Sequence, residues 1–332
     1  MNTETIISIG PLPEWVIEEL GKDLEVICLD DSDRSAVLNA LDDRVIGIIA
    51  RGPVCVDREI MEKAPNLRVI SRTGVGYDSV SIPDASARRI PVVYTPGAMT
   101  RGVAEHALAL ILSAVKKMGT WSRALQNGDW NIRYTTQSRD LEGSTVGIIG
   151  YGRIGRAVRE LLRPFNTRVI ADDPYINHSE FSADEIEFAD LDETLSRSDI
   201  VTLHVPLTEE TYRLINSKNI HRMKAESILI NTARGNVVEN LDLLYAALEE
   251  NRLGAVGLDV FPDEPPDRNH PLFKHPRAFC TGHVAARSPR SQRRILDTML
   301  RETKAVLKGN LPHPENVVNP EVLLSNPDAK LT

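Results

Sequence analysis

The sequence predicts an α/β protein with two doubly wound parallel-sheet domains. The chain has 332 residues, which is long for one domain and sufficient for two at roughly 150 residues each. Short runs rich in Val and Ile alternate with stretches of helical periodicity, and this alternation occurs in two separate series. Apolar strands that alternate with helices are typical of a parallel sheet covered on both faces.

The first series occupies about the first hundred residues. Its predicted strands are Thr5–Ile9, Glu25–Leu29, Val45–Ala50, Leu67–Ser71 and Pro91–Thr95. The stretches between them, such as Pro13–Leu20 and Asp57–Lys63, have the spacing of amphipathic helices. This series therefore predicts one complete sheet domain.

A long helical stretch follows at Gly102–Leu125. One face of it carries apolar residues at three- and four-residue steps, namely Val103, Ala107, Leu110, Ile111 and Ala114. The next segment, Gln126–Leu141, is polar and rich in turn residues, so it is predicted to be a connecting arm rather than core.

The second series begins at Ser144. Its six predicted strands are Thr145–Ile149, Arg168–Asp172, Ile200–His204, Ser227–Asn231, Ala255–Phe261 and Ala278–Thr281. Six parallel strands make a full dinucleotide-binding sheet. A last amphipathic helix is predicted at Pro289–Lys308, and the proline-containing tail Leu311–Thr332 is predicted to be extended.

The charge and the N-terminus exclude several classes of protein. The net charge is −8, so binding to nucleic acid or to an anionic membrane is not expected. The N-terminus lacks a signal peptide's basic and apolar regions, and the most apolar window, Ala107–Val115, is too short to span a bilayer. Cys28, Cys55 and Cys280 have no metal-binding spacing, which indicates reduced thiols in the cytoplasm and no metal.

A glycine-rich loop predicts a dinucleotide site of the Rossmann type. The buried strand Val146–Ile149 is followed by Gly150, Gly152 and Gly155 in G-x-G-x-x-G spacing, and a helix opens behind them. The glycines permit a tight turn, close approach of a pyrophosphate and close packing of helix on strand. The helix N-terminus attracts the anion.

The acid after the next strand favours NAD over NADP. Asp173 lies 18 residues past Gly155, close to the offset of about 20 residues for a ribose-binding acid. A carboxylate there accepts hydrogen bonds from the ribose hydroxyls and repels a 2′-phosphate. The alternative is that Asp173 only caps the end of a strand.

Three polar residues stand at or near the carboxyl ends of apolar strands. They are Arg234, Asp259 and His283. Because ligands of open α/β sheets bind outside those strand ends, we expect the three to face one site. The alternatives are a structural ion pair for Arg234, a turn cap for Asp259 and a satisfied polar side chain for His283.

Seven runs in order make the chain resemble the D-isomer-specific 2-hydroxyacid dehydrogenase family, which includes phosphoglycerate dehydrogenases and glyoxylate/hydroxypyruvate reductases. The runs are Arg72–Asp78, Thr95–His106, Val146–Gly155, Ser198–Thr208, Ile230–Gly235, Leu258–Pro265 and Thr281–His283. Together they cover nearly the whole chain.

The resemblance implies catalytic roles. His283 is the general acid/base, and Glu264 pairs with it and raises its pKa. Arg234 binds the substrate carboxylate, and Asp259 holds the nicotinamide carboxamide. The resemblance implies cofactor binding by Gly150, Gly152, Arg153, Ile154, Gly155, Asp173, His204, Val205, Pro206, Thr232, Ala233, Arg234, Asp259, His283 and Ala285. It implies substrate binding by Arg51, Val75, Gly76, Arg234 and His283.

The resemblance also implies the domain plan. A Rossmann NAD domain, residues 102–285, is inserted into a flavodoxin-like substrate (catalytic) domain made of residues 1–101 and 286–332. The helix and arm at 102–141 form the interface of a homodimer.

The sequence departs from the family pattern at several positions. Met99 stands where the family often has Asn, and Arg287 and Arg290 stand where many members have small or aromatic residues. Together with Arg51 they hint at a phosphorylated or dicarboxylic substrate. The alternative is that they are solvated surface arginines.

Three function classes stay open. The first is an NAD-dependent D-2-hydroxyacid dehydrogenase acting on phosphoglycerate, glyoxylate or hydroxypyruvate. The second is an NAD(H)-sensing corepressor-like binding protein on the same fold, which the acidic chain disfavours. The third is a formate or phosphite dehydrogenase; the Glu264–His283 pair disfavours formate, because formate oxidation needs no base to deprotonate a hydroxyl.

Overall fold

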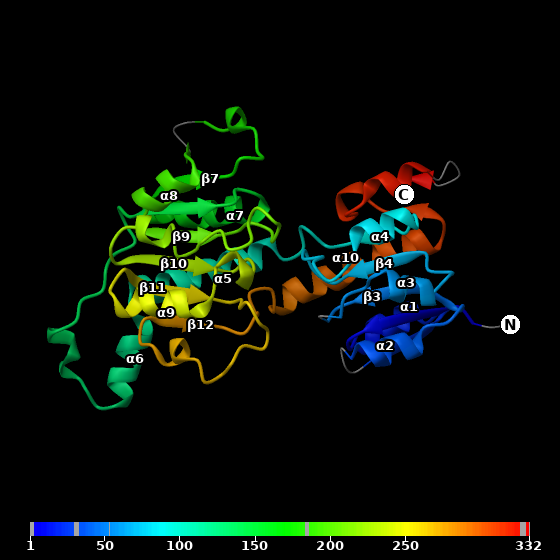
Figure 1. Cartoon of the computed structure of the whole chain (residues 1–332), viewed down its shortest axis with the longest axis horizontal. Helices are drawn as coiled ribbons and strands as arrows, with labels where there is room; N and C mark the ends of the chain where they lie inside the picture. The colour runs from blue at the N-terminus through cyan, green and yellow to red at the C-terminus, as the bar shows by residue number, and fades with distance from the viewer. Residues whose placement is uncertain (1–2, 30–32, 53, 183–185, 326–329, 332) are drawn as a thin grey trace. The chain divides into compact units, whose positions relative to one another are not determined.

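The computed structural model divides the chain into two compact units. It describes residues 3–29, 33–52, 54–182, 186–325 and 330–331. The first unit consists of Met1–Met99 and Pro289–Thr332, and the second of Thr100–Ser288 (Figure 1). Among the described residues, no helix combines the length and apolar character needed to cross a membrane.

The first unit contains a five-stranded parallel sheet in the order β2-β1-β3-β4-β5. Its strands are β1 Thr5–Ile9, β2 Glu25–Leu29, β3 Val45–Ala50, β4 Val69–Arg72 and β5 Val92–Val93. Its helices are α1 Glu14–Leu20, α2 Arg34–Ala40, α3 Arg58–Lys63, α4 Ile82–Ala87 and α10 Pro289–Leu307. This strand order is the flavodoxin-like one, with its switch point between β1 and β3.

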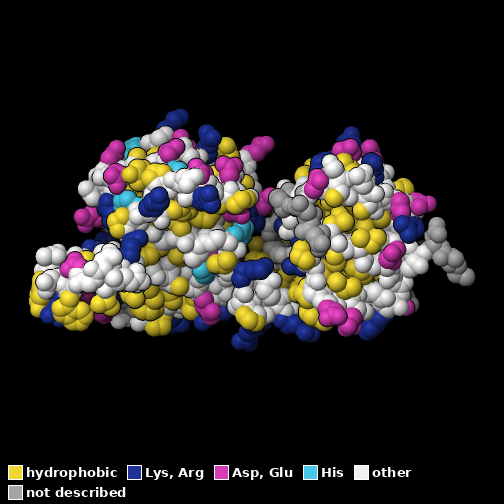
Figure 2. Space-filling model, turned by 90° about the horizontal axis from the view of Figure 1, so that it is seen from below, with side chains coloured by type: hydrophobic (Ala, Val, Ile, Leu, Met, Phe, Trp, Pro, Cys, Tyr) yellow, Lys and Arg dark blue, Asp and Glu magenta, His cyan; other side chains and the backbone are white. Residues whose placement is uncertain are grey.

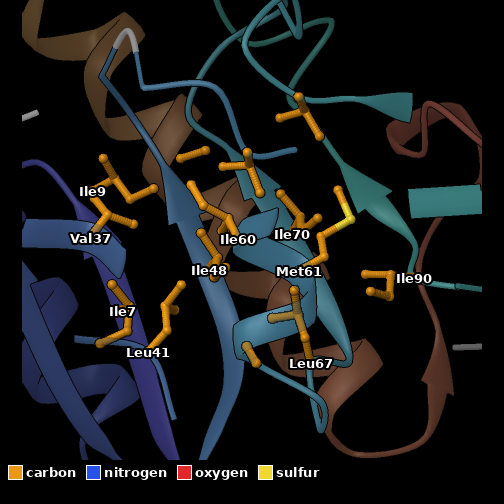
Figure 3. Packing of buried hydrophobic residues seen from close by; sticks show 14 of the residues in the cluster. Ile7, Ile9, Val37, Leu41, Ile48, Ile60, Met61, Leu67, Ile70 and Ile90 are labelled. Carbon is orange, nitrogen blue, oxygen red and sulfur yellow. The ribbon is translucent and has the colours of Figure 1, made fainter. Parts of the chain in front are cut away.

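Helices cover both faces of this sheet, which explains why its central strands β1 and β3 are buried at every position. On one face, Ile7 of β1 and Ile48 of β3 pack in a cluster with Ile60 and Met61 of α3, all without exposed surface (Figure 3). On the other face α1 and α10 pack against β1 and β3. Burial of each such side chain contributes roughly 1.5–3 kcal/mol.

The second unit contains a seven-stranded parallel sheet in the order β12-β11-β10-β9-β6-β7-β8. Its strands are β6 Thr145–Ile149, β7 Arg168–Asp172, β8 Glu187–Phe188, β9 Ile200–Leu203, β10 Ser227–Asn231, β11 Leu253–Leu258 and β12 Ala278–Cys280. Its helices are α5 Thr100–Val115, α6 Met118–Gln126, α7 Arg153–Leu162, α8 Leu191–Arg197 and α9 Leu241–Glu249. The order is that of a Rossmann sheet with one more strand at an edge, and the chain reverses between β6 and β9.

The predicted helix Gly102–Leu125 is in fact two helices. The apolar stripe of α5 is buried as predicted, but it ends at Val115. Lys117 then adopts a left-handed conformation with φ 51°, which an α-helix cannot continue, and α6 begins at Met118. The predicted arm that follows contains a single 3₁₀ turn at Asn131–Tyr134.

The ends of β4, β5, β9 and β12 differ from prediction by one or two residues, and three further differences concern β8, β11 and the tail. The two-residue strand β8 was too short for its periodicity to indicate it. Strand β11 ends at Leu258, so Asp259 follows the strand instead of interrupting it. The tail is not simply extended, because it forms 3₁₀ turns at Pro314–Asn316 and Pro320–Ser325; its residues 326–329 and 332 lie outside the described residues.

A buried carboxylate explains why the tail folds back. Glu302 of α10 is 2% exposed and accepts hydrogen bonds from His313 N at 2.8 Å and Asn316 Nδ2 at 2.9 Å. Val317 then pairs antiparallel with Val93 at the edge of the sheet. The carboxylate, which no periodicity reveals, thus fixes the direction of the tail.

Candidate active site

The glycine loop between β6 and α7 has the geometry that a dinucleotide requires. Gly150 has φ 88°, a conformation that other residues rarely adopt, and its N–H donates to Asp172 O at 2.8 Å. A Cβ on Gly155 would lie 2.3 Å from Gly150 O, so only glycine permits this approach of helix to loop. A Cβ on Gly152 would meet nothing within 4 Å, which leaves open space in front of the N-terminus of α7. The loop therefore fits a pyrophosphate.

Asp173 lies directly after β7 and holds the glycine loop. Its Oδ2 accepts from Tyr151 N at 2.8 Å, and its Oδ1 accepts from Tyr175 N at 3.0 Å. A carboxylate has about four acceptor positions, so each oxygen can still accept a hydroxyl. Its neighbour Asp172 has a pKa raised to about 6 by burial and by the charges of Asp173 and Asp190.

Two buried polar atoms at strand ends fit a bound cofactor. His204 Nδ1 and Thr232 Oγ1 have no hydrogen-bond partner within the described part of the chain. Burial lowers the pKa of His204 to about 3, so the ring is neutral, and its Nε2 contacts Thr202 Oγ1 at 2.9 Å. Buried polar groups without a partner cost free energy unless a ligand satisfies them.

The other residues predicted to bind cofactor lie at the same edge of the sheet. Arg153 and Ile154 begin α7, Val205 and Pro206 follow β9, and Ala233 follows β10. Ala285 is buried, and its N–H donates to Asp259.

Glu264 and His283 are in direct contact. His283 Nδ1 lies 2.7 Å from Glu264 Oε2, and Glu264 Oε1 accepts from Phe261 N at 3.0 Å. The hydrogen bond to Glu264 raises the pKa of His283, against burial, which lowers it. Burial raises the pKa of Glu264, but the bonds from His283 and Phe261 outweigh burial and lower it. The pair is therefore arranged to keep a proton on the imidazole.

Arg234 follows β10 and is positioned by a residue that the sequence analysis did not single out. Buried Asn231 accepts from Ala233 N at 3.0 Å and donates to Arg234 O at 2.8 Å, which fixes the turn. Gly235, the residue after Arg234, packs against the backbone just before Glu264. A Cβ on Gly235 would lie 1.8 Å from the carbonyl carbon of Phe261. The Arg234 turn and the Glu264 turn are thus locked together.

Asp259 is fully buried and holds the segment that carries His283. Its carboxylate accepts from Thr281 Oγ1 at 2.6 Å, Val284 N at 2.9 Å and Ala285 N at 2.9 Å. Its backbone oxygen accepts from His283 N at 2.7 Å. The family resemblance implies that Asp259 holds the nicotinamide carboxamide. These contacts add a second role, which is to hold the backbone segment that carries His283.

The predicted substrate residues Arg51, Val75 and Gly76 belong to the first unit, whereas Arg234 and His283 belong to the second. Arg51 follows β3, and its guanidinium donates to Pro11 O. A second residue that the sequence analysis did not single out is Arg72. It donates to Gly76 O at 2.8 Å and to Ala50 O at 2.7 Å, and so supports the loop that carries Val75 and Gly76.

Met99, Arg287 and Arg290, which depart from the family pattern, are close in sequence to the points where the chain passes from one unit to the other. Met99 ends the first segment, and its Cε lies 3.4 Å from where a Cβ on Gly74 would be. Arg287 and Arg290 are both exposed, on either side of the start of α10.

Comparison with known proteins assigns the family. The family model described as D-isomer specific 2-hydroxyacid dehydrogenase, NAD binding domain, matches residues 108–285, more than half of the chain. This chain is a D-isomer-specific 2-hydroxyacid dehydrogenase. The glyoxylate reductase of Thermofilum pendens is 38% identical to this dehydrogenase over 303 residues, which cover 90% of this chain and 85% of that protein.

Two further proteins are similar to this dehydrogenase. The D-3-phosphoglycerate dehydrogenase of Archaeoglobus fulgidus is 34% identical over 288 residues, which cover 86% of this chain but 54% of that longer protein. The solved structure of D-lactate dehydrogenase from Aquifex aeolicus, complexed with NAD and lactic acid, has a TM-score of 0.86 at 29% identity. The superposition covers 95% of this chain and 98% of that one.

The comparisons confirm four predictions from the sequence: the family, the two-domain α/β fold class, NAD as cofactor and an oxidoreductase activity. The second unit of this dehydrogenase contains the family's NAD-binding domain. The corepressor-like alternative is not favoured. The roles of individual site residues stay predictions.

Proposed function

We propose that this NAD-dependent D-2-hydroxyacid dehydrogenase uses His283 as its general acid/base, with Glu264 as the partner of His283. The observation that carries the proposal is the 2.7 Å contact between His283 Nδ1 and Glu264 Oε2. Because Nδ1 faces the carboxylate, Nε2 is the nitrogen that exchanges a proton with the substrate oxygen. In reduction Nε2 donates the proton to the carbonyl oxygen, and in oxidation it accepts the hydroxyl proton.

We assign binding of the substrate carboxylate to Arg234. Its guanidinium offers a fixed fork of donors that matches a carboxylate, and its side chain follows the same strand end as Thr232. For the first unit we assign carboxylate binding to the N–H groups of Val75 and Gly76, and binding of the rest of the substrate to Arg51.

The cofactor residues follow from the loop geometry. When bound, NAD would supply the hydride acceptor for oxidation of the hydroxy acid, and NADH would supply the hydride donor for reduction of the keto acid. The loop Gly150–Gly155 holds the pyrophosphate, Asp173 accepts from the adenosine ribose, and Asp259 orients the carboxamide. The open space at Gly152 and the unpartnered atoms of His204 and Thr232 support this assignment.

We propose glyoxylate or hydroxypyruvate as the substrate ahead of a phosphorylated acid. The glyoxylate reductase relative is 38% identical over 90% of this chain, whereas the phosphoglycerate dehydrogenase relative is 34% identical over 86% of it. The exposed Arg287 and Arg290 leave a phosphorylated substrate as the second candidate.

The proposal is tested by NADH oxidation with glyoxylate, hydroxypyruvate, phosphohydroxypyruvate, pyruvate and 2-ketoglutarate. Removing a general acid costs about 10²–10⁴-fold in rate, so we expect His283→Gln to lose at least a hundredfold in kcat while it still binds NADH. Full activity of His283→Gln refutes the acid/base assignment. Tight NADH binding without turnover of any substrate favours the NAD(H)-sensing alternative, and a wild-type preference for NADPH refutes the role of Asp173.

A further inference from the structure

We propose that Thr281 and His106 are positioning residues for His283, acting through a chain of hydrogen bonds that ends on Asp259. The inference rests on the proposed acid/base role of His283. Neither residue is part of the predicted catalytic or cofactor set. Both lie in the second unit, His106 in α5 and Thr281 directly after β12.

The chain joins three elements that are far apart in the sequence. His106 Nε2 lies 2.8 Å from Thr281 Oγ1, and Thr281 Oγ1 lies 2.6 Å from Asp259 Oδ1. His106 Nε2 is also 3.5 Å from the same carboxylate oxygen. The His106 side chain is 21% exposed and that of Asp259 is 1% exposed, so the chain runs from the edge of α5 into the interior.

The direction of the chain follows from proton counting. Thr281 has one hydroxyl proton, and it donates that proton to Asp259. Its oxygen must therefore accept from His106, so His106 carries a proton on Nε2. The order of donation is His106 to Thr281 to Asp259; if Thr281 donated to His106 instead, its oxygen would face Asp259 Oδ1 with no proton between them.

Asp259 connects these hydrogen bonds to the segment that carries His283. One carboxylate oxygen receives both Thr281 Oγ1 and Val284 N, and the other receives Ala285 N. A buried carboxylate needs all its donors, because an ionised group without them is costly to bury. When Thr281 or His106 no longer donates, Asp259 shifts toward other donors and displaces Val284 and Ala285.

His283 is sensitive to such a shift because its backbone is strained. It has φ 54°, a left-handed conformation that costs a non-glycine residue roughly 1–2 kcal/mol. The segment keeps that conformation because both sides are fixed: His283 N donates to Asp259 O, and the next two N–H groups donate to the Asp259 carboxylate. A loosened carboxylate lets His283 relax and moves its ring away from Glu264.

Three variants test the chain. Thr281→Val keeps the shape and removes the hydroxyl, Thr281→Ser keeps the hydroxyl, and His106→Leu removes the first donor. We expect Thr281→Val to lose about tenfold in kcat, the size of one hydrogen bond to a charged group, with KM and NADH affinity little changed. Thr281→Ser should restore most of that loss, and Thr298→Val, a threonine partly exposed on α10, should have wild-type kcat.

The double variant gives the sharpest outcome. If the two residues act through a single series of hydrogen bonds, removing the second bond costs little more activity than removing the first. The double variant Thr281→Val with His106→Leu should therefore have nearly the kcat of Thr281→Val alone. Hydrogen exchange at the Val284 and Ala285 amides should be faster in both single variants, which is a readout independent of turnover. Additive losses in kcat, or unchanged amide exchange, overturn the proposal.

The His283→Gln variant distinguishes a failure of the acid/base assignment from a failure of the positioning proposal. If His283→Gln keeps its activity, the acid/base assignment fails, although amide exchange still tests the hydrogen-bond chain. If His283→Gln is inactive while Thr281→Val has wild-type kcat, only the positioning proposal fails. A loss of thermal stability in Thr281→Val without a loss of kcat shows a purely structural role and also overturns the proposal.

Discussion

His283 and Asp259 have different places in the proposed catalytic segment, one exposed and the other buried. His283 is exposed, with 53% of its side chain accessible, as a proton donor to a small substrate must be. Asp259 has no exposed surface, and its carboxylate accepts three hydrogen bonds from the segment that carries His283. Because the buried residue fixes the backbone that presents the exposed one, substitutions at either site affect the same reaction by different routes.

The Glu264–His283 contact predicts the pH profile. The carboxylate raises the pKa of His283, so the imidazolium persists to higher pH. Keto acid reduction needs that imidazolium, and Glu264→Gln removes the cause of the raised pKa. The falling limb of kcat against pH for reduction is therefore expected to move to lower pH in Glu264→Gln.

A matched control exists in the same unit. His275 Nε2 lies 3.2 Å from Glu249 Oε1, a second Glu–His pair that has no catalytic assignment. Glu249→Gln should leave the pH profile unchanged. A Glu264→Gln profile that coincides with wild type shows that Glu264 does not set the pKa of His283.

At the scale of elements, the site depends on turns that touch one another. Parallel strands bring their carboxyl ends to one edge of a sheet, which places the turns after β10 and β11 side by side. The two turns approach so closely at Gly235 that no side chain fits between them. Asn236 Nδ2 adds a hydrogen bond to Pro262 O at 3.3 Å.

Gly235→Ala is expected to separate the Arg234 turn from the Glu264 turn. The new methyl group would overlap the backbone at Phe261, with 1.8 Å between the Cβ and the carbonyl carbon, and backbone cannot yield as a flexible side chain can. Overpacking of this kind costs typically 1–3 kcal/mol or more. We expect a lower melting temperature and at least a tenfold loss in kcat, measured by thermal unfolding and NADH oxidation.

Gly97→Ala is the control for that substitution. A Cβ at Gly97 would meet nothing within 4 Å, so this variant should unfold at nearly the wild-type temperature. If Gly235→Ala is as stable and as active as Gly97→Ala, the two turns are not coupled in the way that the structure indicates.

At the scale of the whole molecule, we propose that α6 and the arm Gln126–Leu141 form a surface for self-association. Four large hydrophobic residues are exposed here: Met118 at 56% and Leu125 at 63% in α6, and Trp130 at 60% and Tyr134 at 73% in the arm. Hydrophobic side chains are visible at the α6 end of the second unit in Figure 2. Large apolar side chains that are exposed close together in the sequence are typical of protein interfaces.

We therefore expect a homodimer whose interface includes the arm. Leu125→Glu with Trp130→Glu should give a monomer, because a charge in place of a buried apolar side chain opposes association. Sedimentation or light scattering at micromolar concentration measures the mass. Tyr212→Glu changes an exposed aromatic outside the arm and should leave the dimer intact; a wild-type monomer or an unaffected double variant contradicts the prediction.

Periodicity and motif spacing were sufficient for the main elements and for the residue types of the site. Strands buried on both faces, such as β1 and β3, are rich in Ile and Val, and this pattern needs no tertiary information. Glycine spacing located the dinucleotide loop, and Asp173 followed from its offset. Periodicity failed for β8, which has two residues, and for the break at Lys117, where nothing in the apolar pattern marks a left-handed residue.

The sequence by itself determined the fold class and the dinucleotide loop, because these depend on local spacing, and together with the family resemblance it named the residues proposed to carry the chemistry. Only the tertiary structure decided how those residues are held. Asn231, Arg72, Thr281 and His106 lie within the family runs, but those runs do not show what each side chain contacts, since the partner of each hydrogen bond is set by how the chain folds. Side-chain partners across elements depend on three-dimensional distance, and a single sequence does not encode that distance in any short-range pattern.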